Sequence, residues 1–78
     1  MSKEIKSCDV HLPDGEVRKD VRLYDYPLKG DYIDLYFGQG IYKYSKRFEV
    51  IHRVFDEVRI TPHSISGGTI HIYLRDVE

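Results

Sequence analysis

The chain concentrates its binding chemistry in one segment, Tyr42-Lys43-Tyr44-Ser45-Lys46-Arg47, which holds two tyrosines and three cations. Aromatic rings can stack on nucleic-acid bases or pack against a protein, and cations can reach phosphates. Side chains alternate along a strand, which would give one face with Tyr42, Tyr44 and Lys46 and another with Lys43, Ser45 and Arg47. The segment predicts a binding strand. The alternative is a solvated strand whose tyrosines reflect β-propensity alone.

Tyrosine is the dominant aromatic residue, with seven Tyr against three Phe and no Trp. Tyr32, Tyr36 and Tyr73 fall at outward positions of alternating segments. Outward tyrosines are typical of protein interfaces, because they combine apolar area with a hydroxyl group. If their strands are neighbours, the three form a patch for a protein partner or a second copy of the chain. The alternative is cross-strand aromatic pairing that only supports the sheet.

Patterns for metal binding and catalysis are missing from the sequence. The histidines His11, His52, His63 and His71 and the single Cys8 form no close pair at a familiar metal-ligand spacing. The carboxylates define no acid–base pair, and turn chemistry accounts for Asp14 and Asp31. There is no Ser-His-Asp arrangement, Walker loop or GxGxxG motif. We expect a non-enzymatic protein without catalytic residues, metal or cofactor.

The charge balance argues against a dedicated non-specific nucleic-acid binder. Twelve Lys and Arg face thirteen Asp and Glu, for a net charge of −1, whereas such binders are clearly basic. The charges are unevenly placed, because residues 9–34 carry an acidic excess and residues 41–60 a basic one. This separation favours self-association or a charged partner.

The length of 78 residues predicts one small β domain over residues 1–78. One cysteine excludes an intrachain disulfide and favours the cytoplasm, and we expect Cys8 to be a small buried hydrophobe. No run of about 18 apolar residues is present, so we expect no membrane partner.

The N-terminal half reads as three strands. Pro13-Asp14-Gly15 supplies a turn between residues 4–12, with Cys8, Val10 and Leu12 on one face, and residues 16–23. The second segment would place Val17, Val21 and Leu23 on one face. Residues 31–37 alternate most clearly, with an inward face of Ile33, Leu35 and Phe37.

The C-terminal half is β-rich but changes parity. In residues 41–55 one parity holds Phe48, Val50, His52 and Val54 and the other Ile51 and Phe55, so either both faces are covered or a bulge lies near Ile51. A helix over residues 46–55 is the alternative. Residues 58–60 continue that strand or form a short one, residues 61–68 read as a loop, and residues 69–75 as a strand. Five or six strands predict an all-β fold, a small SH3-like barrel or meander sandwich.

Three stretches carry a resemblance: Tyr26-Pro27-Leu28-Lys29-Gly30-Asp31-Tyr32-Ile33, Arg47-Phe48-Glu49-Val50-Ile51-His52-Arg53-Val54 and Ile70-His71-Ile72-Tyr73-Leu74. Together they resemble small uncharacterised SH3-like β-barrel proteins of bacteria and phages, over roughly residues 10–75. The resemblance implies a barrel fold and a phage or mobile-element setting, and it supplies no catalytic residues to transfer.

These observations lead to two main functional hypotheses. The preferred one is a non-enzymatic protein-binding module, in the form of a phage-encoded inhibitor of a host or defence protein in the host cytoplasm. Its predicted contact residues are Tyr32, Tyr36, Tyr73, Tyr42, Lys43, Tyr44, Lys46 and Arg47. The alternative is a nucleic-acid or nucleotide binder that uses Tyr42–Arg47. A small hydrolase is a third, weaker reading.

Overall fold

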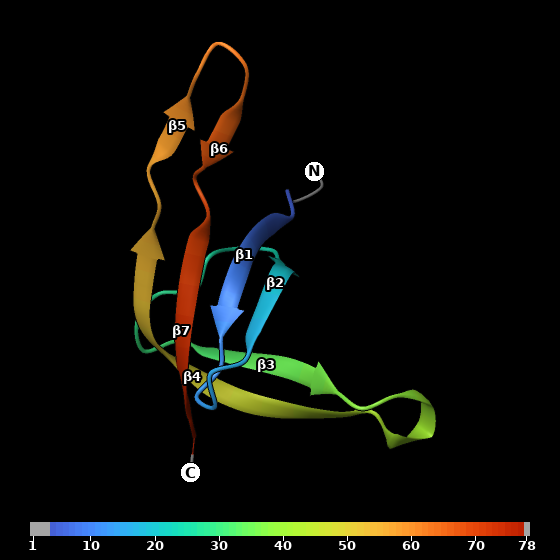
Figure 1. Ribbon diagram of the computed structural model, residues 1–78. Coiled ribbons are helices and arrows are strands. Elements are labelled where there is room, and N and C mark those ends of the chain that lie inside the picture. The colour runs from blue at the N-terminus through green and yellow to red at the C-terminus, as the bar shows by residue number, and fades with distance from the viewer. Residues whose placement is uncertain (1–3, 78) are drawn as a thin grey trace.

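The computed structural model describes residues 4–77 and consists almost entirely of β-strands (Figure 1). The all-β prediction is confirmed, and the helical alternative for residues 46–55 is wrong because a single long strand covers them. The elements in chain order are β1 (Lys6–His11), β2 (Val17–Leu23), β3 (Tyr32–Phe37), the 3-10 turn η1 (Gly40–Tyr42), β4 (Tyr44–Phe55), β5 (Val58–Ile60), β6 (Ile65–Gly67) and β7 (Ile70–Asp76).

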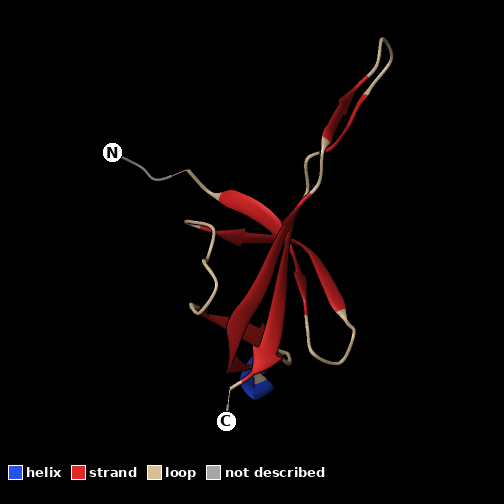
Figure 2. Ribbon diagram, turned by 90° about the vertical axis from the view of Figure 1, so that its left-hand side faces the viewer, coloured by secondary structure: helices blue, strands red, loops and turns tan. Residues whose placement is uncertain are grey.

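Five strands form the main sheet, in the spatial order β2-β1-β7-β4-β3. Neighbours are antiparallel except β1 and β7, which run parallel. The sheet curls strongly into a half-barrel, as the crossing strands in Figures 1 and 2 show. β2 and β3 are its two free edges. The observed fold is thus a small barrel-like sheet whose two edge strands, β2 and β3, are not paired with each other.

The concave face of the sheet carries the core. Alternation places apolar side chains there from β1, β3, β4 and β7, as predicted for β1 and β3. Burial also raises the pKa of the Cys8 thiol, which agrees with the predicted role of Cys8 as a buried hydrophobe. The buried residues are Cys8, Val10, Leu12, Ile33, Leu35, Phe48, Val50, Ile72 and Leu74.

Two bulges set which side chains face the core. Of the two alternatives for residues 41–55, the bulge is confirmed at Ile51, where the register of β4 against β7 shifts between Val50 and His52. A second lies in β2, where Asp20 adopts a left-handed φ of 57° and the register against β1 shifts. Because of the extra residue, the side chains of β2 before the bulge point to the opposite faces from those that simple alternation predicts. Val17 is therefore exposed, contrary to the predicted face, and Arg18 takes the concave side.

Beyond the main sheet, β5 and β6 form a separate two-stranded hairpin that projects from the half-barrel (Figures 1 and 2). The prediction of a loop over residues 61–68 is wrong for residues 65–67, which pair with β5. Gly67 and Gly68 have φ values of 80° and 74°, and this left-handed pair lets the chain change direction between β6 and β7. In residues 4–77, no helix is long and apolar enough to cross a membrane.

Candidate functional site

The eight predicted contact residues occupy four places in the fold. Tyr32, Tyr36 and Arg47 lie on the outer face of β3 and β4, opposite the core. Tyr44 and Lys46 lie on the concave face, in line with Phe48. The other three residues are Tyr42 and Lys43, at the turn between β3 and β4, and Tyr73, on β7.

An ion pair separates Tyr32 from Tyr36 on the outer face. The Arg47 guanidinium donates to both oxygens of Asp34, at 2.8 Å from Nε and 3.2 Å from Nη2, and lies 6.0 Å from the Tyr32 ring centroid. The hydrogen bond from Arg47 lowers the pKa of Asp34. Both tyrosines are exposed, whereas the charge of Arg47 is largely neutralised. This face therefore offers two aromatic side chains on either side of an exposed ion pair.

An open hollow of about 790 Å³ adjoins this face beside Tyr32 and Arg47. Its other walls come from the loop at residues 25–28, from Asp31 and from Arg53. Two turn contacts hold the loop, since the Leu28 amide donates to the Asp31 carboxylate and the Gly30 amide donates to the Val50 carbonyl, both at 2.8 Å. The hollow gives the outer face a concave border that a partner side chain can enter.

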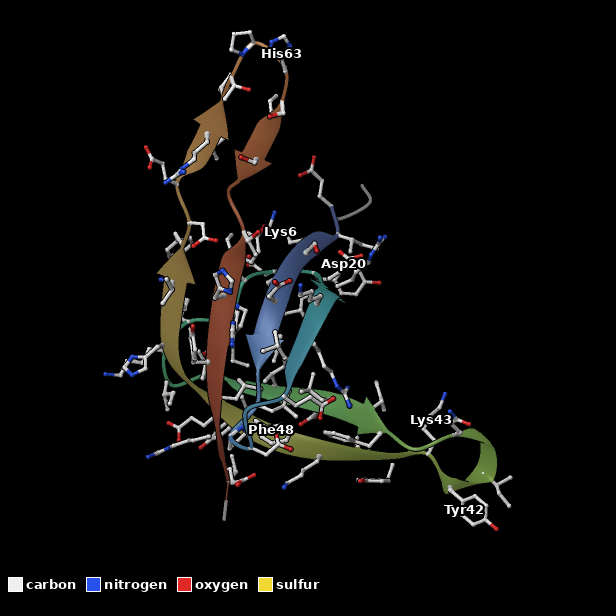
Figure 3. The ribbon with its side chains drawn as sticks, viewed as in Figure 1. Lys6, Asp20, Tyr42, Lys43, Phe48 and His63 are labelled. Atoms are coloured by element: carbon white, nitrogen blue, oxygen red, sulfur yellow. The ribbon has the colours of Figure 1, made fainter. Side chains whose placement is uncertain are left out.

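The turn between β3 and β4 presents two large apolar side chains to solvent. Ile41 is 91% exposed and Tyr42 is 79% exposed. Figure 3 shows Tyr42 pointing away from the sheet at this turn. Tyr42 lies in the 3-10 turn η1 and Lys43 follows it before β4 begins, so the predicted strand positions of both residues are wrong. Gly38 and Gly40 have φ values of 79° and 58° and permit this turn. Sequence reasoning missed Ile41, although its position between two glycines and a tyrosine marks the tip.

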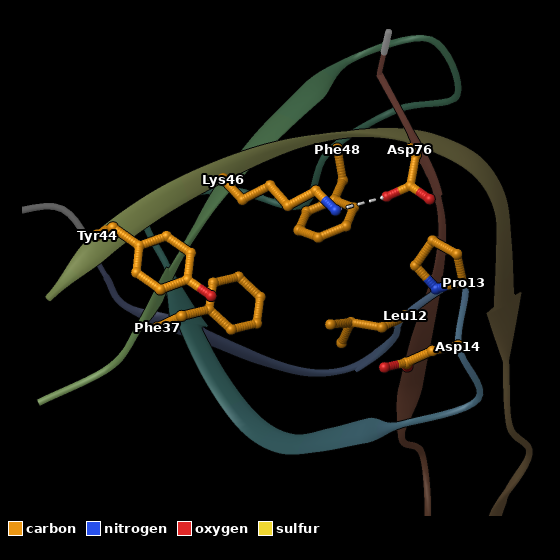
Figure 4. Close-up of a pocket in the computed structure, with 8 residues that line it drawn as sticks. All are labelled: Leu12, Pro13, Asp14, Phe37, Tyr44, Lys46, Phe48 and Asp76. Carbon is orange, nitrogen blue, oxygen red and sulfur yellow. Dashed lines mark ion pairs between the residues drawn. The ribbon is translucent and has the colours of Figure 1, made fainter. Parts of the chain in front are cut away.

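The concave-face residues line a pocket of about 180 Å³ (Figure 4). The Tyr44 ring stacks on Phe37, with centroids 5.5 Å apart. Lys46 Nζ lies 3.0 Å from Asp76 and 5.2 Å from the Phe48 centroid. Tyr44 and Lys46 therefore extend the hydrophobic core toward the rim of the half-barrel and do not share a surface with Arg47.

Tyr73 belongs to a separate cluster on the outer face. Its ring stacks on His11, with centroids 4.1 Å apart. His11 Nε2 lies 2.9 Å from His71 Nδ1, and His71 Nε2 lies 3.0 Å from an oxygen of Asp56. The carboxylate accepts, so His71 donates through Nε2 and a neutral His71 accepts from His11. β4 lies between β7 and β3, so Tyr73 and the two tyrosines of β3 are not on neighbouring strands.

The comparisons with known proteins give no match. No family model, no curated protein and no solved structure matches this chain.

Two of the three cations in the segment Tyr42–Arg47 form ion pairs with neighbouring carboxylates. Arg47 pairs with Asp34 and Lys46 with Asp76, while Lys43 forms no ion pair within residues 4–77. In the same described range, no group of three or more His, Cys, Asp or Glu side chains is arranged to hold a metal ion. The arrangement is suited to contact with a partner through aromatic and aliphatic side chains.

Proposed function

We propose that this chain is a non-enzymatic protein-binding module of the cytoplasm whose principal contact is the hairpin tip, defined as residues 38–43. The exposure of Ile41 and Tyr42 at the end of a glycine-shaped turn carries this proposal. Exposed apolar side chains held together in a fixed turn are costly to hydrate, and covering them by a partner stabilises the complex.

The outer tyrosines extend the same contact along the hairpin. Tyr32 and Tyr36 lie on β3, which leads directly to the tip, and the adjoining hollow lies beside Tyr32. Tyrosine is enriched among residues that dominate binding energy, because its rigid ring buries much area for little lost entropy. A partner that covers the tip and β3 would meet three tyrosines and one isoleucine.

A protein partner is better supported than a nucleic acid. Nucleic-acid affinity depends on cations that are free to neutralise phosphates. Two of the three cations in the segment Tyr42–Arg47 are instead paired with Asp34 and Asp76, and the chain has a net charge of −1. The resemblance to small phage proteins implies a more specific version of this proposal, in which the partner is a host or defence protein and the bound module inhibits it.

Site-specific photocrosslinking in cells tests the proposal. A photoreactive phenylalanine analogue replaces Tyr42, and in a matched control it replaces Tyr24, which is 68% exposed but lies outside the proposed contact. We expect a discrete crosslinked protein from position 42 and none from position 24. The same protein should be lost from pull-downs with Tyr42→Ala. Equal crosslinking at both positions, or no loss with Tyr42→Ala, would contradict the proposal.

A further inference from the structure

The β5–β6 hairpin exposes an apolar face that nothing in residues 4–77 covers. All six of its strand residues are exposed, with Ile60 at 76% and Ile65 at 74%. The pairs Ile60–Ile65 and Val58–Gly67 share one face, and the pair Arg59–Ser66 occupies the other. An isolated two-stranded hairpin is marginal in water, and stability requires three or more strands with an apolar face. Further strands added to the hairpin would therefore stabilise it.

The free edge of β5 is the one suited to pairing. The Glu57 carbonyl accepts from the Gly68 amide at 3.2 Å, and the Thr61 amide donates to the Ser64 carbonyl at 2.8 Å. Backbone groups alternate in direction along an antiparallel pair, so Val58 and Ile60 turn their amides and carbonyls to the open edge. On the other strand, the left-handed φ values of Gly67 and Gly68 interrupt an extended edge.

The charges on β5 identify the strand that pairs with it. Glu57 and Arg59 flank Val58 on the polar face, and neither forms an ion pair within the described residues. When Val58 of one β5 strand lies opposite Val58 of the other in an antiparallel pair, Glu57 of each copy lies directly opposite Arg59 of the other. Cross-strand pairs at these positions are stabilising when the charges are opposite. The strand is thus complementary to itself.

We infer that two copies of this chain dimerise through antiparallel pairing of their β5 strands. The product is a four-stranded sheet, β6-β5-β5-β6, related by a two-fold axis that makes the interface isologous. It joins the two apolar faces of Val58, Ile60 and Ile65 and forms two Glu57–Arg59 pairs between the copies. Charge on the chain does not oppose the contact, because the net charge is −1. The hairpin tip between β3 and β4 (residues 38–43) takes no part in this interface.

Sedimentation equilibrium over a wide concentration range tests the dimer. We expect a monomer–dimer equilibrium for the wild type. Arg59→Glu replaces both ion pairs by like charges and should raise the dimer Kd about tenfold or more. Glu57→Arg/Arg59→Glu reverses every charge and should restore the dimer. Glu57→Arg and Arg59→Glu proteins, each impaired alone, should form a heterodimer when mixed, because the mixture recreates both pairs.

Two further variants separate the interface from general effects. Lys19→Glu makes the same charge change on β2 and should leave the dimer unchanged. Ile60→Asp should abolish it without altering either ion pair, with circular dichroism unchanged because Ile60 lies outside the core. A wild type that stays monomeric, or an Arg59→Glu protein that dimerises as tightly as wild type, would overturn the inference. Tyr42→Ala should dimerise normally, which keeps this test separate from that of the proposed function.

Discussion

Arg18 on β2 donates a hydrogen bond from Nη1 to the backbone carbonyl of Tyr36 on β3, over 2.8 Å. These strands are the two free edges of the five-stranded sheet, so the contact spans the opening of the half-barrel. The same guanidinium lies 4.2 Å from the centroid of the Phe37 ring. A side chain therefore links the edges where a closed barrel would have a ladder of backbone hydrogen bonds.

The link between Arg18 and Tyr36 predicts a measurable loss of stability on substitution. Arg18→Met keeps an aliphatic stem but removes both the hydrogen bond and the cation–π contact. We expect the free energy of unfolding in urea to fall by about 1–2 kcal/mol. Lys19→Met is the control, because the neighbouring side chain forms no hydrogen bond or ion pair within residues 4–77. Equal midpoints for the two variants would show that the link does not stabilise the half-barrel.

The position of Arg18 also shows where sequence reasoning reached its limit. The bulge near Ile51 was predictable because β-branched and aromatic residues change parity there. The bulge at Asp20 was not, because a left-handed φ at aspartate leaves no periodic mark in a segment rich in charges. The prediction therefore assigned Val17 to the core face and left Arg18 outside.

The same limit applies to the candidate site. The alternation that separates Lys46 from Arg47 was predicted correctly, but the prediction placed both in one contact surface and did not assign Lys46 to the concave side beside Phe48. The parallel pairing of β1 with β7 depends on contacts about 60 residues apart in the chain. No local pattern indicated it, so the stacking of Tyr73 on His11 and its separation from Tyr32 emerged only with the fold.

The hairpin tip predicts different costs for alanine at its two glycines. Gly38 and Gly40 both have positive φ, which costs an L-residue roughly 1–2 kcal/mol. A Cβ on Gly38 would also overlap the Tyr42 carbonyl, whereas a Cβ on Gly40 would meet no atom within 4 Å. Gly38→Ala should therefore destabilise the protein more than Gly40→Ala, and only Gly38→Ala should shift the amide resonances of residues 41–43 strongly.

Matched urea unfolding and two-dimensional NMR spectra of the two glycine variants provide the measurement. Equal destabilisation, with equally small shifts at the tip, would mean that the turn adjusts freely. In that case the exposed pair Ile41 and Tyr42 would not be held in a fixed arrangement.

The Asp34–Arg47 pair predicts a dependence on pH with a definite sign. Hydrogen bonding from Arg47 lowers the pKa of Asp34 in the folded protein below its unfolded value of about 3.9. A group whose pKa is lowered on folding stabilises the folded protein at pH values above its unfolded pKa. This stabilisation is lost as the pH falls through the folded pKa. Because both groups are exposed, the effect on stability is small, and NMR is the better measurement.

Titration of the Asp34 carboxyl carbon should give a midpoint lower in wild type than in Arg47→Met. Arg22→Met removes an arginine that pairs elsewhere, with Asp20, and should leave the Asp34 midpoint unchanged. Identical midpoints in wild type and Arg47→Met would show that the ion pair is not formed in solution.

The ion pairs of Lys46 with Asp76 and of Arg47 with Asp34 predict weak binding of single-stranded oligonucleotides. Each phosphate that a cation neutralises makes the slope of log K against log salt more negative by about 0.7 for single strands. Lys43 is the cation of the segment Tyr42–Arg47 that forms no ion pair within residues 4–77. We therefore expect fluorescence anisotropy to give a slope of log K against log salt of about −0.7, which corresponds to one phosphate contact. Asp34→Asn/Asp76→Asn releases both held cations and should steepen the slope and tighten binding. Tight, steeply salt-dependent binding by the wild type would instead favour nucleic acid over protein as the partner of the β3–β4 hairpin.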